Sequence, residues 1–415
     1  MAQHLTIYAL CHQPRRIKLP AEGIKAGASP AAIESGLFDE DANRFYFREV
    51  ATYCYHPAMQ LWRRLLDEGM ALGLGVSVSF LKQAESWDES LLDRLRQLAV
   101  HPQCELVAVE PYHSFLPLID LPHFQQRMRW GDAYAEALLG RRPRVADTTE
   151  MLMSDAIYTA LAAAGYEAAF LDGREWVLGW RQPTRLYHGG LAEGPHQLQL
   201  LARHRDLSDD VGYRFSNREW DQFPLLAPAW AKWVAQAGGD FVCVSWDFET
   251  FGAHHTRDSG IFEFLAALPR ALSEHNVQCL RPSEIVGRFQ SQSHCLPLPH
   301  FATTWAGDGN WEFFLGNKAQ QALFQLMLAA YNKARLTDDD QLIDLALWLL
   351  QSDNLHWLQW YGHWGPEAEV SAYFTPREWW SLGTERIVWE QQLVYLNFLS
   401  ALDPYIPSSR SDQPT

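Results

Sequence analysis

Apolar residues recur along the first 290 residues in short runs that predict buried strands. In the first run, His4–Cys11, the odd-numbered residues are apolar and alternate with other side chains, which is the two-residue period of a strand. Seven further segments predict strands: Leu74–Leu81, Glu105–Glu110, Arg144–Thr148, Tyr166–Leu171, residues 196–204, Phe241–Trp246 and the short Val277–Leu280.

Segments with the period of an amphipathic helix lie between these strands. They are His56–Glu68, Asp88–Ala99, Phe124–Leu139, Asp155–Ala164 and Ile261–Leu272. Strands that alternate with helices form mainly parallel sheets, because each crossover helix returns the chain to the same edge. The sequence therefore predicts an α/β fold, a closed barrel of seven or eight strands.

The pattern changes near residue 290. Residues 291–300 are polar and contain proline, which predicts a linker between a barrel domain, residues 1–290, and a helical bundle domain, residues 301–415. We expect the tail after about residue 405 to be flexible. Residues 20–50 mix glycine, proline and charges, which predicts a long loop with a binding or lid role. The helical segments of the second domain are Lys318–Lys333, Asp338–Gln351 and Pro376–Leu402.

Composition narrows the possible partners and the compartment. The formal net charge of -16 argues against binding to nucleic acid or to an anionic membrane surface, and no apolar run is long enough to span a membrane. The 6 cysteines form no CxxC pair, which predicts free thiols in a reducing compartment. The first residues lack the pattern of a signal peptide, so we expect a cytoplasmic protein. No glycine-rich fingerprint indicates a nucleotide cofactor.

Residues capable of acid, base or ligand chemistry follow several of the predicted strands. Asp247 and Glu249 come directly after the strand that ends at residue 246. His12 follows the first strand, His113 follows the third, and Glu150 lies where a short strand meets a helix. In parallel barrels the carboxyl ends of the strands meet on one face, where active sites are built. We therefore expect these side chains to gather on one face of the barrel.

Aromatic residues are concentrated near the end of the chain. The segment Ser352–Pro366 holds three tryptophans, one tyrosine and two histidines, and a loop of this length cannot bury them all. Aromatic faces stack on the apolar faces of sugar rings, while nearby polar groups bind the hydroxyls. The segment is therefore a candidate sugar-binding loop.

Two chemistries fit these residues. Glycoside hydrolysis needs one carboxylate as nucleophile or base and a second as proton donor, and Glu150 and Asp247 can serve. Metal-assisted hydrolysis is the alternative, although the chain lacks HxxxH and HxH spacings. The candidate ligands for that metal ion are His12, His113, Asp247 and either His254 or His255.

Five motifs in this chain resemble those of glycoside hydrolase family 57, especially its α-amylase-like members. They are His12-Gln13-Pro14, the block that ends in Tyr112-His113-Ser114, Thr149-Glu150-Met151, the run WDFETFGAH at Trp246–His254, and Leu350–Asp353 with the aromatic loop after it. The run DFETFGAH together with the TE motif, in this order, is the specific part of the resemblance.

The resemblance implies a (β/α)7 barrel, a distorted TIM-like fold, with a C-terminal α-helical bundle. It further implies an α-amylase-like, retaining action on intracellular α-glucans or maltooligosaccharides, without a metal or other cofactor. Glu150 would be the nucleophile and Asp247 the acid and base, with their carboxyls about 5–5.5 Å apart. Glu249 would be a supporting acid. The expected sugar-binding residues are His12, His113, Trp180, Trp246, Arg203, Asp210, His254, Asp353 and Trp357.

Some positions depart from the family pattern and leave the substrate open. Asp147-Thr148 replaces a common Arg-Asn pair, Ala253 replaces a common Glu, and Asn354 lies near the place of a His. Both catalytic acids remain, so the open question is hydrolysis against transfer, as in 4-α-glucanotransferases or branching enzymes. A non-catalytic α-glucan-binding protein with the same barrel is a further alternative. The sequence does not define an oligomeric state.

Overall fold

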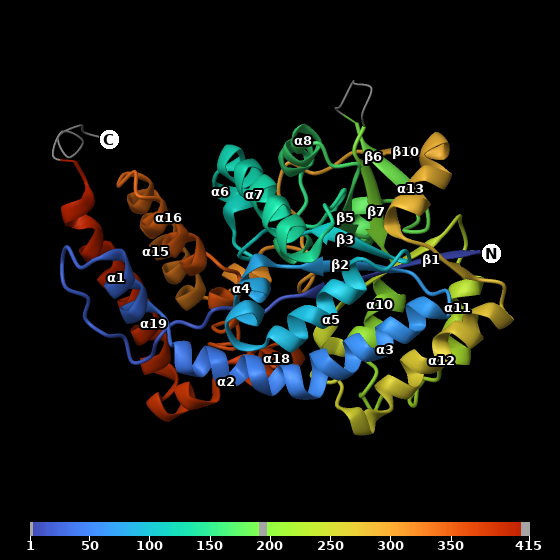
Figure 1. Ribbon diagram of the computed structural model, residues 1–415, viewed down its shortest axis with the longest axis horizontal. Helices are drawn as coiled ribbons and strands as arrows, with labels where there is room; N and C mark the ends of the chain where they lie inside the picture. The colour runs from blue at the N-terminus through green and yellow to red at the C-terminus, as the bar shows by residue number, and fades with distance from the viewer. Residues whose placement is uncertain (1–2, 191–196, 408–415) are drawn as a thin grey trace. The chain divides into compact units, whose positions relative to one another are not determined.

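The computed structural model describes residues 3–190 and 197–407 and divides into two compact units (Figure 1). The first unit comprises Met1–Gln13, Tyr46–Pro111 and Asp120–Trp305, and the second comprises Pro14–Phe45, Tyr112–Ile119 and Ala306–Thr415. The predicted division into a barrel domain, residues 1–290, a linker and a helical domain, residues 301–415, stays a prediction. Residues 408–415 of the predicted tail, and residue 196 of one predicted strand, lie outside the described residues.

All ten described strands belong to one sheet of the first unit. Their order is β10-β6-β7-β5-β4-β3-β2-β1-β8, with β9 paired to β1, and the neighbours are parallel except β6 with β7. The strands are β1 (His4–Cys11), β2 (Leu72–Val76), β3 (Cys104–Ala108), β4 (Val145–Ala146), β5 (Ala168–Asp172), β6 (Leu186–Gly189), β7 (Gln199–Arg203), β8 (Val242–Asp247), β9 (Gln278–Cys279) and β10 (His294–Leu296).

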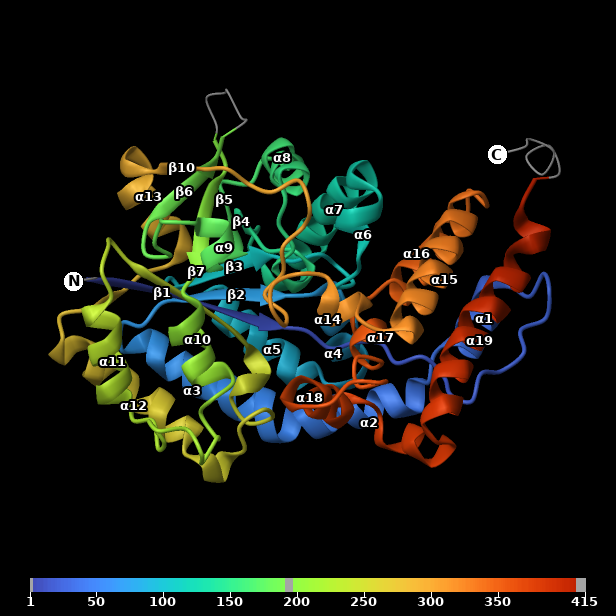
Figure 2. The ribbon, with the colours of Figure 1, turned by 180° about the vertical axis from the view of Figure 1, so that it is seen from behind.

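The sheet curls so that β7 meets β8. Strand β6 covers the first part of β7, and the His204 N–H just after β7 donates to the Cys243 carbonyl of β8 at 2.7 Å. The parallel strands β1, β2, β3, β4, β5, β7 and β8 thereby form a seven-membered ring. Figure 2 shows β6 and β10 added beside β7.

Helices cover the outside of these strands (Figure 1). Helices α11, α12, α3, α5, α7 and α8 pack in succession against one another. Their bounds are α11 (Ala227–Gln236), α12 (Ile261–Glu274), α3 (His56–Asp67), α5 (Glu89–Ala99), α7 (Leu121–Leu139) and α8 (Asp155–Ala164). The other helices of this unit are α4 (Val78–Trp87), α9 (Glu175–Leu178), α10 (Arg205–Gly212) and α13 (Pro282–Phe289).

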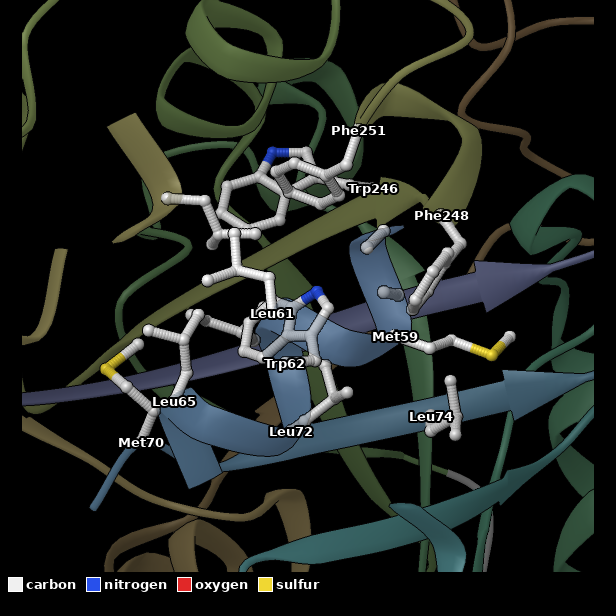
Figure 3. Packing of buried hydrophobic residues seen from close by; sticks show 14 of the residues in the cluster. Met59, Leu61, Trp62, Leu65, Met70, Leu72, Leu74, Trp246, Phe248 and Phe251 are labelled. Atoms are coloured by element: carbon white, nitrogen blue, oxygen red, sulfur yellow. The ribbon is translucent and has the colours of Figure 1, made fainter. Parts of the chain in front are cut away.

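Strand alternation separates two apolar layers. On β8, Val242, Val244 and Trp246 face the helices, and Figure 3 shows Trp246 there with side chains of α3 and β2. Cys243 belongs to a second cluster inside the ring, which also contains Tyr8 of β1. The residue after Trp246 therefore points into the ring, which directs Asp247 to the inside at the strand's carboxyl end.

The second unit is helical. Helix α15 packs against α16 and α19, and α1 packs against α16 and α19. No described helix is long and apolar enough to cross a membrane. The helices are α1 (Pro30–Leu37), the first half of α2 (Glu40–Val50), α6 (Leu116–Ile119), α14 (Glu312–Leu315), α15 (Lys318–Arg335), α16 (Asp340–Leu349), α17 (Asp353–His356), α18 (Pro366–Phe374) and α19 (Thr384–Leu402).

Three predicted elements differ from the structure. The predicted strand Leu74–Leu81 ends at Val76, because the Ser77 hydroxyl accepts the Phe80 N–H and starts helix α4. The predicted loop at residues 20–50 contains α1 and α2. The predicted helix Pro376–Leu402 is interrupted at Gly383, whose φ of 82° a helix cannot accept. Strands β6 and β10 were not predicted.

Candidate active site

Glu150 lies in a short 3-10 turn, Thr149–Met151, that follows strand β4. Its backbone is left-handed, with φ 53° and ψ 30°, a conformation that most residues adopt only when their surroundings hold them. The Glu150 carbonyl accepts hydrogen bonds from the Trp305 N–H at 3.1 Å and from the Thr304 hydroxyl at 2.8 Å. These bonds fix the turn and place a half-buried carboxyl at the strand end.

The Glu150 side chain is held by the same neighbour. The Trp305 indole N–H donates to Glu150 Oε2 at 2.8 Å. Trp305 was not among the predicted site residues, since it follows the last predicted strand and lies in no recognised motif. Its contact with Glu150 joins residues 155 positions apart, and no local pattern predicts such a contact.

Asp247 is the last residue of β8 and is half-buried. It pairs in register with Leu10 of the neighbouring strand β1. Its charge contributes to the raised pKa values of Asp147 and Glu249, so these three carboxyls lie in one electrostatic environment. Glu150 and Asp247 thus lie at the carboxyl ends of two parallel strands of one ring, as the sequence predicted.

Asp147 is buried three residues before Glu150. Its Oδ2 accepts the Tyr8 hydroxyl at 2.7 Å, and its Oδ1 accepts the Thr148 N–H at 2.8 Å. Burial, with a smaller effect from the Asp247 charge, raises the pKa of Asp147 to about 7. The sequence marked Asp147 only as a departure from the family motif, and the structure shows that it forms a buried carboxyl–phenol pair inside the ring.

Glu249 forms a second pair of this kind. It accepts the hydroxyl of Tyr55, and the Gln13 amide donates to that hydroxyl oxygen at 2.8 Å. Burial, followed by the Asp247 charge, raises the pKa of Glu249 to about 8. Glu249 is thus buried and bonded to a protein group, and the supporting role expected for it stays a prediction.

Arg203, at the end of β7, is the centre of a buried ionic network. Its guanidinium lies 3.2 Å from an oxygen of Asp172 and 2.5 Å from one of Asp209. Arg174 also pairs with Asp172 and donates to the Trp305 carbonyl at 2.7 Å. The structure thus connects the predicted Arg203 to the surroundings of Glu150 through Asp172, Arg174 and Trp305, which were not predicted.

Three other predicted sugar-binding residues of the first unit, His12, Asp210 and His254, are buried or half-buried and bonded to protein groups. His12 is half-buried and hydrogen bonded through Nδ1 to the Ser77 hydroxyl at 2.8 Å. Asp210 is buried and paired with Arg214 at 2.7 Å. His254 is half-buried, and its backbone N–H donates to the Glu249 carbonyl at 2.9 Å.

The two predicted sugar-binding tryptophans of this unit differ in exposure to solvent. Trp180 is 87% exposed just after α9, with its ring beside the Arg181 guanidinium. Trp246 is buried in the outer layer, where its indole N–H donates to the Ser208 carbonyl at 2.9 Å. Because adjacent strand residues point to opposite faces, the structure does not bring Trp246 together with Asp247 inside the ring.

Three predicted residues belong to the second unit. His113 has a left-handed φ of 56°, and its Nδ1 lies 3.1 Å from the Ser352 hydroxyl, which brings it next to Asp353 at the start of α17. Trp357 is buried edge-to-face against Trp379. The aromatic segment does leave one ring in solvent, as predicted, since Trp364 is 92% exposed. The alternative set of metal ligands, His12, His113, Asp247 and either His254 or His255, includes residues of both units. It stays a hypothesis, which the effect of a chelator on activity can test.

A parallel barrel with carboxylates at its strand ends has the groups that glycoside hydrolysis requires. Comparison with known proteins agrees: residues 11–297 match the model of glycosyl hydrolase family 57. A curated protein of Methanocaldococcus jannaschii named "Putative alpha-amylase" is 31% identical over 359 residues, which are 83% of this chain and 74% of that protein. The chain belongs to glycosyl hydrolase family 57 and is a glycosidase.

Solved structures of similar fold include a 4-alpha-glucanotransferase from Thermococcus litoralis, with a TM-score of 0.67 and 17% identity over 95% of this chain. The chain spans 60% of the length of that enzyme. A branching enzyme from Pyrococcus horikoshii has a TM-score of 0.63 and 15% identity, with coverage of 99% of this chain and 98% of the other. These likenesses confirm the predicted fold class, a (β/α)7 barrel with a helical C-terminal region.

Proposed function

We propose that this chain cleaves α-glucosidic bonds of α-glucans or maltooligosaccharides by a retaining mechanism. The observation that carries the proposal is the placement of Glu150 and Asp247 at strand ends of one ring, within the matched family region. The hydrogen bonds to the Glu150 carbonyl and carboxylate support a nucleophile held in a defined orientation.

In the first step, a Glu150 carboxylate oxygen attacks the anomeric carbon, and the bond from that carbon to the leaving oxygen breaks. Asp247 gives its proton to the leaving oxygen, so the departing sugar is neutral. In the second step, Asp247 takes a proton from water as the water oxygen attacks the anomeric carbon. Glu150 leaves as a carboxylate, and both side chains return to their starting states.

Glu150→Gln and Asp247→Asn are the direct test. Each variant should lose at least about a thousandfold in activity on maltooligosaccharides, since each removes a group that the bond-making steps require. The Asp132→Asn variant is a comparison, because Asp132 is a buried acid of helix α7 that accepts the Tyr166 hydroxyl at 2.8 Å and takes no part in the proposed steps. Full activity in either of the first two variants, with circular dichroism showing a folded protein, would refute the assignment.

Transfer to a sugar acceptor is a second candidate activity. The similarity of the fold to that of a glucanotransferase and of a branching enzyme supports this second candidate. Analysis of products from a maltooligosaccharide series separates the two: hydrolysis yields only shorter chains, whereas transfer also yields longer or branched chains. If the chain binds these sugars and releases no product, it is a glucan-binding protein.

We also propose a reducing, cytoplasmic compartment. The support is that the six cysteines are all free and five are buried, as expected for thiols that never need to pair. The motifs of the second unit extend the proposal to His113 and Asp353 as sugar-binding residues, which single substitutions with binding measurements would test.

A further inference from the structure

Trp305 makes three hydrogen bonds that bear on the proposed nucleophile. Its backbone N–H donates to the Glu150 carbonyl at 3.1 Å, and its indole N–H donates to Glu150 Oε2 at 2.8 Å. Its own carbonyl accepts from Arg174 at 2.7 Å. One residue therefore contacts both the backbone and the carboxylate of Glu150, which fixes the turn and the side chain together.

The position of the indole ring is determined by buried charges. Arg174, which holds the Trp305 carbonyl, is 4% exposed and pairs with the fully buried Asp172. The Arg203 guanidinium, which pairs with the same Asp172, lies 5.7 Å from the centre of the Trp305 ring. Two arginines anchored on one aspartate thus orient the tryptophan, and a cation beside its face adds an attractive contact.

An indole N–H can only donate a hydrogen bond. It therefore favours a Glu150 oxygen that carries negative charge over a neutral carboxyl group, and bonds of this kind are about twice as strong as those between neutral partners. We propose that Trp305 is a positioning residue for Glu150: its indole N–H keeps the carboxylate ionised and turned in one orientation for attack. The inference rests on the proposed function for the identity of the attacking group.

The hydrogen bond from the Trp305 indole to Glu150 acts in both steps of the proposed reaction. During attack it holds the plane of the carboxylate while the other oxygen forms the bond to the anomeric carbon. When water later displaces the sugar, negative charge returns to the carboxylate, and the indole N–H already points at the oxygen that receives part of it. Loss of the N–H should therefore slow the chemical steps more than it weakens substrate binding.

The test compares Trp305→Phe with the wild type and with Trp130→Phe as a matched control. Phenylalanine keeps an aromatic ring and removes the donor, while Trp130 lies on helix α7 of the outer layer. Carbon-13 NMR of glutamate-labelled protein, with the Glu150 signal assigned by its loss in Glu150→Gln, gives the titration midpoint of Glu150 directly. The pH dependence of kcat/KM on maltooligosaccharides gives the same quantity through its acid limb.

In Trp305→Phe we expect the titration midpoint of Glu150 and the acid limb of kcat/KM to move upward by about one pH unit. This is a tenfold change in proton affinity, and it follows because a hydrogen-bond donor to the charged carboxylate is lost. We expect kcat to fall by about tenfold or more with little change in KM, and Trp130→Phe to match the wild type. Unchanged midpoint and acid limb in a folded Trp305→Phe protein would overturn the proposal.

Two further measurements keep the proposal testable if the variant does not fold or if the wild type has no activity. If Trp305→Phe does not fold, incorporation of 3-benzothienylalanine at position 305 replaces the N–H by sulfur in a ring of the same shape, and the same upward shift is expected. If the wild type acts on no glucan, the proposed function fails, yet the NMR midpoint still decides whether Trp305 holds the Glu150 carboxylate.

Discussion

At the scale of single residues, the site contains two buried carboxyls that the proposed steps do not use. Asp147 and Glu249 each bond to a buried tyrosine, Tyr8 and Tyr55, and both feel the charge of Asp247. Burial raises both pKa values, to about 7 and about 8, because a charged carboxyl is poorly solvated in the interior of a protein. Proton release from such neighbouring groups belongs to the cluster, so we expect the basic limb of the activity profile to reflect all three acids.

Asp147→Asn should change the pH dependence of stability. The folded protein binds the Asp147 proton more tightly than the unfolded chain, whose carboxyl titrates near 3.8, so this group stabilises the fold below pH 3.8 and that contribution is lost as the pH rises toward about 7. Asparagine mimics the protonated form at every pH. The variant should therefore gain a few kcal/mol of unfolding free energy over the wild type at pH 8, and little at pH 4.

Urea unfolding at pH 4 and pH 8 provides the measurement for Asp147→Asn. Asp93→Asn is a suitable control, because Asp93 is an exposed acid of helix α5 for which the same change should leave both values nearly equal. A variant that is less stable than the wild type at pH 8 would show that Asp147 is ionised and stabilising in the fold.

At the scale of elements, the motif turn after β8 packs against a π-helix, Ala51–Tyr55. The Tyr55 hydroxyl at the end of this helix donates to Glu249. Turns of π-helix are rare in proteins overall, and those that occur often lie at functional sites. Gly252 of the motif has φ +120°, and a Cβ there would lie 2.3 Å from the Tyr53 carbonyl oxygen. The glycine in the motif is therefore required by the close approach of two backbones.

Gly252→Ala should destabilise the turn and remove activity. Alanine adds both the strain of a positive φ, about 1–2 kcal/mol, and a clash with backbone that cannot move aside. Gly69→Ala is a matched control, since Gly69 has φ +91° and nothing within 4 Å of an added Cβ. Thermal unfolding should show a larger loss for Gly252→Ala, and equal losses would mean that the clash is relieved.

At the scale of the whole molecule, the cysteines report on how completely the strands and helices bury their side chains. Five are buried, in β1, β3, β8, β9 and the π-helix, and burial raises the pKa of all five thiols. The pKa values of Cys104, Cys243 and Cys279 rise to about 12, and those of Cys11 and Cys54 rise well above the usual range. Cys295 is exposed. A neutral buried thiol cannot react, so the native protein should show about one fast thiol.

Reaction with Ellman's reagent under native and denaturing conditions checks this count. We expect about one fast thiol in the native protein, its loss in Cys295→Ser, and all 6 thiols after denaturation. Two or more fast thiols in the native protein would mean that the helix layer opens readily over the barrel.

Much of the barrel was predictable from the sequence because strand and helix signals are local. Alternation defined β1, short apolar runs defined β3 and β8 to within two residues, and the helical period defined α3, α5 and α8. Strands β6 and β10 were missed, since short strands at the edge of a sheet carry little pattern of their own. Helices α1 and α2 were missed because glycine and proline nearby suggested a loop.

The sequence by itself determined the order of the motifs and their place at strand ends, and from these it predicted the residues of the proposed chemistry. Only the tertiary structure decided how they are held: Trp305 on Glu150, Tyr8 on Asp147 and Tyr55 on Glu249 join positions 155, 139 and 194 residues apart. It also showed which tryptophans lie in solvent and which in the core. Such contacts depend on closure of the ring and on burial, which depend on the whole chain rather than on any segment.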